Sequence, residues 1–184
     1  MKTVALAELD ALTQADRETL VRASIAELSP QVTSRHVSIA VDEATLYFRA
    51  IFGKNTSLAV LVASADTIQE TFEDRRALYQ RSVHLRRTDH DETDIKTAVA
   101  VIRAQMAAVG GQDSGTLPDS HFTDGTNSHQ FRPENMTYNT AGAIRVGDLI
   151  FSVASDSPGE DRPLAEAIAL RSLIAVQEDL ALPI

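Results

Sequence analysis

The sequence contains no cysteine and no long apolar run. Without a thiol, the chain forms neither a disulfide nor a thiolate metal site, and it has no cysteine nucleophile. No segment approaches the roughly 18–20 consecutive apolar residues that a membrane-spanning helix needs. These absences exclude a disulfide scaffold and a helical membrane protein, and they fit a protein of a reducing compartment.

Basic residues are few compared with acidic ones. The chain has 17 Lys and Arg against 26 Asp and Glu, which gives a formal net charge of −9. A nucleic-acid backbone or an anionic membrane is bound by a basic surface, so we expect neither as the main partner. Glu8 and Asp10 interrupt the first apolar stretch, which makes it a poor signal peptide. We therefore expect a cytoplasmic protein.

Several common catalytic and nucleotide-binding motifs are also absent. The sequence has no GxGxxG, no GxSxG and no HExxH. Gly53-Lys54 resembles the end of a phosphate-binding loop, but the upstream glycine is missing and Asn55 replaces the Ser or Thr. The chemistry therefore cannot be assigned from a known motif.

Hydrophobic periodicity predicts the secondary structure of the first half. A capped amphipathic helix begins near Thr13 and ends at Ser29-Pro30. The β-branched and aromatic runs at 37–41 and 45–52 predict two strands, with His36 at the edge of the first. The apolar run at 57–63 predicts a central strand. A helix then follows from Asp66, with one face formed by Ile68, Phe72, Arg76 and Tyr79.

The second half gives clearer patterns. An apolar stripe predicts a helix that ends at Gly110-Gly111, and the stripe consists of Ile95, Ala98, Val99, Ile102, Met106 and Val109. Residues 143–155 predict a hairpin with Gly147-Asp148 as a two-residue type II′ turn. The last helix should begin at Asp161, because Pro163 then falls in the first turn. Its broad buried face should include Leu164, Ile168, Leu173, Ile174 and Val176.

These elements predict the class of fold. With 184 residues and 43% hydrophobic residues, we expect a single domain that covers residues 1–184. Helices do not alternate with strands as in a doubly wound parallel sheet. We predict an α/β fold of the α+β type, with a mostly antiparallel five-stranded sheet flanked by helices. A long irregular polar segment, residues 110–142, is inserted before the last hairpin.

This polar segment contains most of the candidate site residues. His121 and His129 are eight residues apart, with Asp124 between them and Glu134 beyond. Imidazoles and carboxylates are the expected ligands of zinc, iron or manganese, so a divalent-metal site is one interpretation. A catalytic base is a second interpretation, and two solvated loop histidines are a third.

Other polar groups could bind an anionic ligand. Arg132, with Tyr138 and Asn139, could hold a carboxylate or a propionate, because a guanidinium presents paired donors; it could equally pair with a neighbouring acid. The stretch 155–157 could offer backbone N–H groups and hydroxyls to an anion, or serve only as a turn. His84 and His90 lie in a charged connector, and the second could line a site at the start of the following helix.

Two stretches resemble one known family. LTQADRETLVRASIAEL…HVSIAVDEATLYFRA (12–50) is similar to the opening helix and first hairpin of the GlcG/HbpS-like haem-degrading-domain family. AGAIRVGDLIFSVASDSPGEDRPLAEAIA (141–169) is similar to its closing hairpin and terminal helix. The resemblance implies a profilin-like fold, homo-oligomers and, in some members, binding or breakdown of haem. YNTAGAIRVGDLIF (138–151) also resembles the opening strands of RidA-type imine deaminases.

Three functions remain open from the sequence. The leading hypothesis is a cytoplasmic, oligomeric protein that binds a small molecule, either haem or another anionic ligand, through His121, Asp124, His129, Arg132 and Tyr138. The second is a hydrolase, isomerase or RidA-like deaminase, with His121 or His129 as base or metal ligand. The third is an assembly subunit whose polar segment is an arm that binds a neighbouring subunit.

Overall fold

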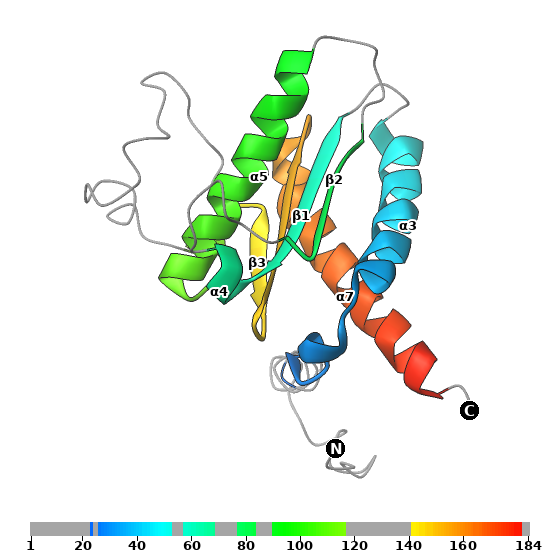
Figure 1. Cartoon of the computed structure of the whole chain (residues 1–184). Coiled ribbons are helices and arrows are strands. Elements are labelled where there is room, and N and C mark those ends of the chain that lie inside the picture. The colour runs from blue at the N-terminus through cyan, green and yellow to red at the C-terminus, as the bar shows by residue number, and fades with distance from the viewer. Residues whose placement is uncertain are drawn as a thin grey trace, which may run out of the picture.

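The protein is an α+β fold in which four helices pack on a four-stranded antiparallel open sheet (Figure 1). This computed structural model describes residues 23, 26–52, 57–68, 77–83, 90–116 and 141–181. The helices are α3 (Ser34–Phe52), α4 (Ala65–Ile68), α5 (His90–Gly110) and α7 (Asp161–Ala181). The described residues also form three short 3-10 helices: η1 (Ser29–Gln31) before α3, η2 (Ser114–Thr116) after α5, and η4 (Pro158–Glu160) between β4 and α7.

The sheet has the order β2-β1-β4-β3, and every neighbouring pair is antiparallel. Its strands are β1 (Leu58–Ser64), β2 (Tyr79–Val83), β3 (Ala143–Val146) and β4 (Leu149–Ser155). β1 and β4 pair along their whole lengths, from Leu58 with Ser155 to Ser64 with Leu149. These two central strands are buried on both faces, which explains why they are apolar almost throughout.

The sheet separates two hydrophobic cores of different character. On one face, α3 and α7 pack against large side chains of the central strands, among them Val60, Val62, Phe151 and Val153. On the other face, α4 and α5 cover a core rich in small residues: Ala59, Leu61, Ala63, Ala65, Ile68, Ala100, Val101, Ala104, Ala107, Ala108, Ala143, Ile150 and Ala154. Successive strand residues alternate between the two cores, as the period of two requires.

Two predicted strands are wrong. Residues 37–41 and 45–52 belong to a single 19-residue helix, α3, and His36 lies on that helix and not at a strand edge. Within each short run, the β-branched and aromatic residues imitate a strand. Over the whole segment, Val37, Val41 and Phe48 recur at helical spacing and are buried against the sheet. Packing of this face overrides the local preference for strand.

The predicted helix from Asp66 is also only partly correct. Only its beginning is helical, as the short helix α4. Tyr79, which the prediction places on the same helix face as Ile68, is the first residue of the edge strand β2. Phe72 and Arg76 lie outside the described residues. The described sheet therefore has four strands, in which β2 replaces the two strands that were predicted before β1.

Four predicted elements are confirmed. The run 57–63 forms the central strand β1, and residues 143–155 form the hairpin β3-β4. Gly147 and Asp148 make its two-residue turn, in which Gly147 has a φ of 60° that suits glycine. α5 ends at Gly110, and α7 begins at Asp161, so that Pro163 lies in its first turn.

The buried faces of α5 and α7 differ in detail from the predicted ones. The predicted apolar stripe of α5 is not its buried face: Ile95 and Val109 are exposed and Ile102 is only partly buried, although Val99 packs against the core. Its alanine-rich side contacts the strands instead, because small side chains let the helix approach closely. On α7 the predicted face is buried except for Ile174, which is exposed.

Candidate ligand-binding groove

The ligand-binding residues predicted from the polar segment lie outside the described residues. These are His121, Asp124, His129, Arg132 and Tyr138, so the metal, catalytic-base and arm hypotheses stay predictions. His84 also lies outside them, and His90 is the first residue of α5. Within the part of the chain that the structure describes, no three His, Asp or Glu side chains gather in a way that could hold a metal ion.

The stretch 155–157 is used by the fold itself. The Ser155 hydroxyl donates to Asp161 Oδ1 at 2.5 Å and accepts a hydrogen bond from the Ser157 N–H at 3.0 Å. Asp156 accepts a hydrogen bond from the Ser57 N–H at 2.5 Å and forms an ion pair with Lys96 on α5. These contacts support the interpretation of the stretch as a turn that joins β4 to α7.

His36 connects the start of α3 to the end of α7. The imidazole is 7% exposed, and its Nδ1 accepts a hydrogen bond from the Thr33 N–H at 3.1 Å. Nε2 then carries the proton and donates to Asp179 Oδ2 at 2.9 Å. This hydrogen bond lowers the pKa of the Asp179 carboxyl, and the positive charge of Arg35 contributes less. The pair is therefore a structural clamp between two helices.

The clamp predicts a specific pH dependence of stability. Because the pKa of Asp179 is lower in the folded state, its contribution is present above the unfolded value of about 3.9 and is lost as the pH falls below it. We expect wild type to lose more stability than Asp179→Asn between pH 5 and pH 3. Urea unfolding at both pH values measures this difference. Parallel pH profiles for the two proteins would contradict the role of the clamp.

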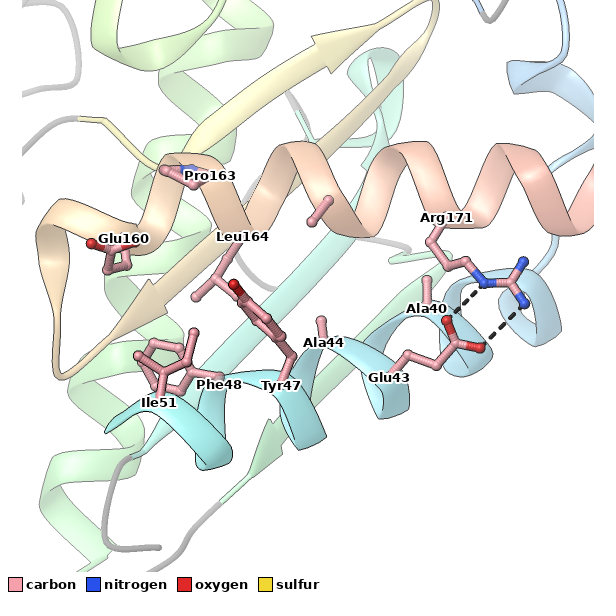
Figure 2. A pocket seen from close by; sticks show the side chains of 11 residues that line it. Ala40, Glu43, Ala44, Tyr47, Phe48, Ile51, Glu160, Pro163, Leu164 and Arg171 are labelled. Atoms are coloured by element: carbon pink, nitrogen blue, oxygen red, sulfur yellow. Dashed lines mark hydrogen bonds and ion pairs between the residues drawn. The ribbon is translucent and has the colours of Figure 1, made fainter. Parts of the chain in front are cut away.

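A groove lies between α3 and α7 on the outer side of their layer (Figure 2). The helices run in opposite directions, so that Ile51 lies near the start of α7 whereas Glu43 lies beside Arg171. The groove has a volume of about 420 Å³. Its lining is mainly apolar and consists of Ala40, Glu43, Ala44, Tyr47, Phe48, Ile51, Glu160, Pro163, Leu164, Ala167 and Arg171.

Small residues in the middle of each helix create the groove. Ala40 and Ala44 on α3 and Ala167 on α7 leave space where larger side chains would close the helix interface. Tyr47 and Ile51 border this space, and both are more than half exposed, at 67% and 53%. Figure 2 shows the Tyr47 ring between the two helices, with Phe48 and Ile51 beside it. Phe48 is buried and belongs to the core beneath α3.

One end of the groove carries a network of charged side chains. Arg171 binds both carboxylate oxygens of Glu43, from Nε at 2.7 Å and from Nη2 at 3.2 Å, and its Nη1 contacts Glu178 at 3.1 Å. The hydrogen bonds from Arg171 lower the pKa of Glu43, and the two carboxylates raise the pKa of Arg171. At the other end, Glu160 adds a further carboxylate. The rim therefore has more negative than positive charge.

The sequence interpretation missed this groove for a definite reason. Its α3 wall was divided between two predicted strands, with Ala44 in the turn that joins them. A signal was nevertheless present, because Ala40, Ala44, Tyr47 and Ile51 are spaced by four, three and four residues. This is the spacing of one helix face. The α7 wall was correctly predicted as a helix, but nothing in the sequence brings the two helices together.

Comparisons with protein-family models, curated proteins and solved structures find no match to the chain. The resemblances to the haem-degrading-domain family and to the imine deaminases therefore stay predictions. In the described ranges, no helix is both long and apolar enough to cross a membrane. The groove is thus the feature from which a function can be argued.

Proposed function

We propose that this protein binds a small molecule with an apolar body in the groove between α3 and α7. The observation that carries the proposal is the groove itself, an apolar hollow of about 420 Å³ with charged groups only at its rim. Known ligand sites have volumes of roughly 300–1,000 Å³ and combine an apolar lining with a few polar groups. The profilin-like fold belongs to the same proposal, supported by the antiparallel sheet and by the packing of α3 and α7 on one face.

The charges at the rim narrow the ligand class. Glu43 and Glu178 both pair with Arg171, which is the one cation among the described residues that line the groove. Glu160 adds a further negative charge at the other end. An uncharged or positively charged polar group meets a favourable field here, whereas the two propionates of haem would meet repulsion. Within the proposal, a neutral or cationic ligand is therefore favoured over the haem or other anionic ligand expected from the sequence.

Filling the groove tests the proposal. We expect Ala167→Trp to weaken the binding of Nile red, an uncharged polarity-sensitive dye, by at least about tenfold, because the indole occupies the hollow. Val109→Trp is the matched control, since Val109 is 72% exposed on α5, in the other helical layer. Fluorescence titration of wild type and both variants gives the affinities. Equal affinity in wild type and Ala167→Trp would contradict the proposal, as would no dye binding by wild type.

Competition separates the ligand classes. A cationic alkylammonium amphiphile below its micellar concentration should displace Nile red at a lower concentration than haemin. If haemin displaces the dye at a lower concentration than the amphiphile, an anionic ligand, as expected from the sequence, would be favoured instead.

A further inference from the structure

The outer surface of the α3-α7 layer leaves many large apolar side chains exposed. In the described part of the chain, eight large hydrophobic side chains are exposed, and only Ile95 and Val109 lie elsewhere, on α5. The other six lie on α3 and α7. Five of them are Leu46, Tyr47, Ile51, Leu170 and Ile174, whereas the sixth, Leu180, shares the helical face of the buried Leu173 and Val176 near the end of α7. Exposed apolar area concentrated on one side of a molecule marks an interaction surface.

The exposed residues follow the spacing of packed helices. On α7, Pro163, Ala167, Leu170 and Ile174 are separated by four, three and four residues. On α3, Ile39, Glu43, Leu46 and Ala50 repeat the same intervals. A 4-3-4 repeat places side chains in one stripe that fits between the side chains of a facing helix, as in helical bundles. Each helix thus presents a second packing face, opposite the one that contacts the sheet.

We infer that a second copy of this chain covers this face, in a dimer whose two-fold axis runs along the groove, parallel to the two helices. Rotation about this axis places α3 of each copy opposite α7 of the other. The level of a residue along the helices does not change in this rotation. Since Glu43 and Arg171 of one chain lie at one level, joined by two hydrogen bonds, each Arg171 comes to face the partner's Glu43.

Charge favours a second copy over an unrelated partner. Beside the apolar stripes, Glu43 and Arg171 place one acidic and one basic group at the same level, so this pair is complementary to itself under this rotation. The cation at this level is matched by a carboxylate in either copy, and the four-helix arrangement has the usual form of a helix bundle.

The available area is also sufficient. α3 has 19 residues and α7 has 21, so each is about 30 Å long, and two adjacent helices present a face about 20 Å wide. The resulting area of about 600 Å² per copy is close to the roughly 800 Å² per partner of a standard stable interface.

The dimer would complete the proposed ligand site. A single groove is open on its outer side, whereas two grooves that face each other across the axis form one enclosed cavity. Small-molecule sites typically bury most of the ligand surface. Only this statement about the contents of the cavity rests on the proposed function, because the pairing of the helices does not need a ligand.

The decisive experiment uses charge reversal in ligand-free full-length protein. Wild type should have about twice the 19.9 kDa mass of one chain in size exclusion with light scattering at about 50 µM. The dimer has two contacts between position 171 of one copy and position 43 of the other. Arg171→Glu alone, or Glu43→Arg alone, places like charges at both contacts, so each variant should have half the mass of wild type. An equimolar mixture should return to the dimer mass, since each interface contact is then between opposite charges. In each variant, positions 43 and 171 of the same chain carry like charges. A return to the dimer mass in the mixture can therefore come only from contacts between the two different chains.

Leu170→Arg and Ile95→Arg form the matched pair for the apolar surface. These residues are exposed to nearly the same degree, 47% and 48%, on opposite layers. Leu170→Arg should give a monomer and Ile95→Arg a dimer, with unchanged circular dichroism in both. A monomeric wild type, a dimeric Leu170→Arg variant or a mixture that stays monomeric would each overturn the inference. A dimeric wild type that does not bind Nile red would overturn the proposed function alone.

Discussion

Arg103→Met should lower the free energy of unfolding by about 3–5 kcal/mol at pH 7. Arg103 is 4% exposed on α5, and its Nη1 donates to the Asp161 carboxylate and to the Val153 carbonyl, both at 2.6 Å. Methionine fills a similar volume but leaves Asp161, which is 1% exposed, without this cation. Removing one partner of a buried ion pair costs this much because the other charge loses its compensation. Urea denaturation measures the difference.

The loss should depend on pH in a defined direction. Burial raises the pKa of Asp161 above its ordinary value, although the hydrogen bonds from Ser155 and Arg103 oppose this effect. The folded state therefore binds the proton more tightly than the unfolded chain, and stability falls as the pH rises from the unfolded value of about 3.9 toward the folded one. Without Arg103 the folded pKa rises further, so this decrease continues to higher pH. We expect a clearly smaller loss at pH 5 than at pH 8.

A second substitution should recover much of the stability. In Arg103→Met/Asp161→Asn no charge is left in the core, while the amide oxygen introduced at position 161 still accepts the hydrogen bond from Ser155. The double variant should be more stable than Arg103→Met alone at pH 8. Because asparagine at position 161 does not titrate, this position should no longer make the free energy of unfolding decrease as the pH rises. Arg81→Met is the control, because Arg81 forms an exposed ion pair with Asp42 and should cost at most about 1 kcal/mol. Equal losses at pH 5 and pH 8 would contradict the buried-charge argument.

This ion pair shows where the sequence stops being informative. Residues 103 and 161 are distant along the chain, and the predicted stripe of α5 placed Ile102 and Met106, not Arg103, toward the core. The error has a physical cause: the strands facing α5 present Ala59, Ala63 and Ala154, and a close approach needs the alanine side of the helix. Periodicity identifies the helix but not which of two apolar sides is buried.

The elements predicted correctly share another property. β1, the β3-β4 hairpin and α7 each combine a strong pattern with a local boundary signal, such as the Gly147-Asp148 turn of the hairpin or Pro163 in the first turn of α7. By contrast, α3 carries β-branched residues in a helix, and β2 is a polar edge strand with the sequence YQRSV. The groove needs both α3 and α7 in place, so an error in one helix was enough to hide it. Distant contacts, and not local preference, decide these features.

Gly142→Ala should lower the free energy of unfolding by about 2–4 kcal/mol. Gly142 precedes β3 with a φ of 139°, a conformation that residues with a Cβ rarely adopt. A Cβ atom there would lie 2.5 Å from Arg103 Nη1 and 2.8 Å from the Val153 carbonyl oxygen. Backbone strain and overpacking each cost about 1–3 kcal/mol. The backbone cannot simply move away, because the Gly142 carbonyl accepts a hydrogen bond from the Val153 N–H at 2.8 Å.

Two further variants identify the cause of this loss. Gly159→Ala, in the turn before α7, has no atom within 4 Å of the added Cβ and should change stability by less than about 1 kcal/mol in either direction. In an Arg103→Met background, the flexible end of methionine can move away from the new methyl group, whereas the Val153 carbonyl remains. The two substitutions should therefore cost less together than the sum of their separate losses, by about 0.5–3 kcal/mol. Strict additivity in urea unfolding would show that the strain comes from the backbone alone and that Arg103 does not limit the space at Gly142.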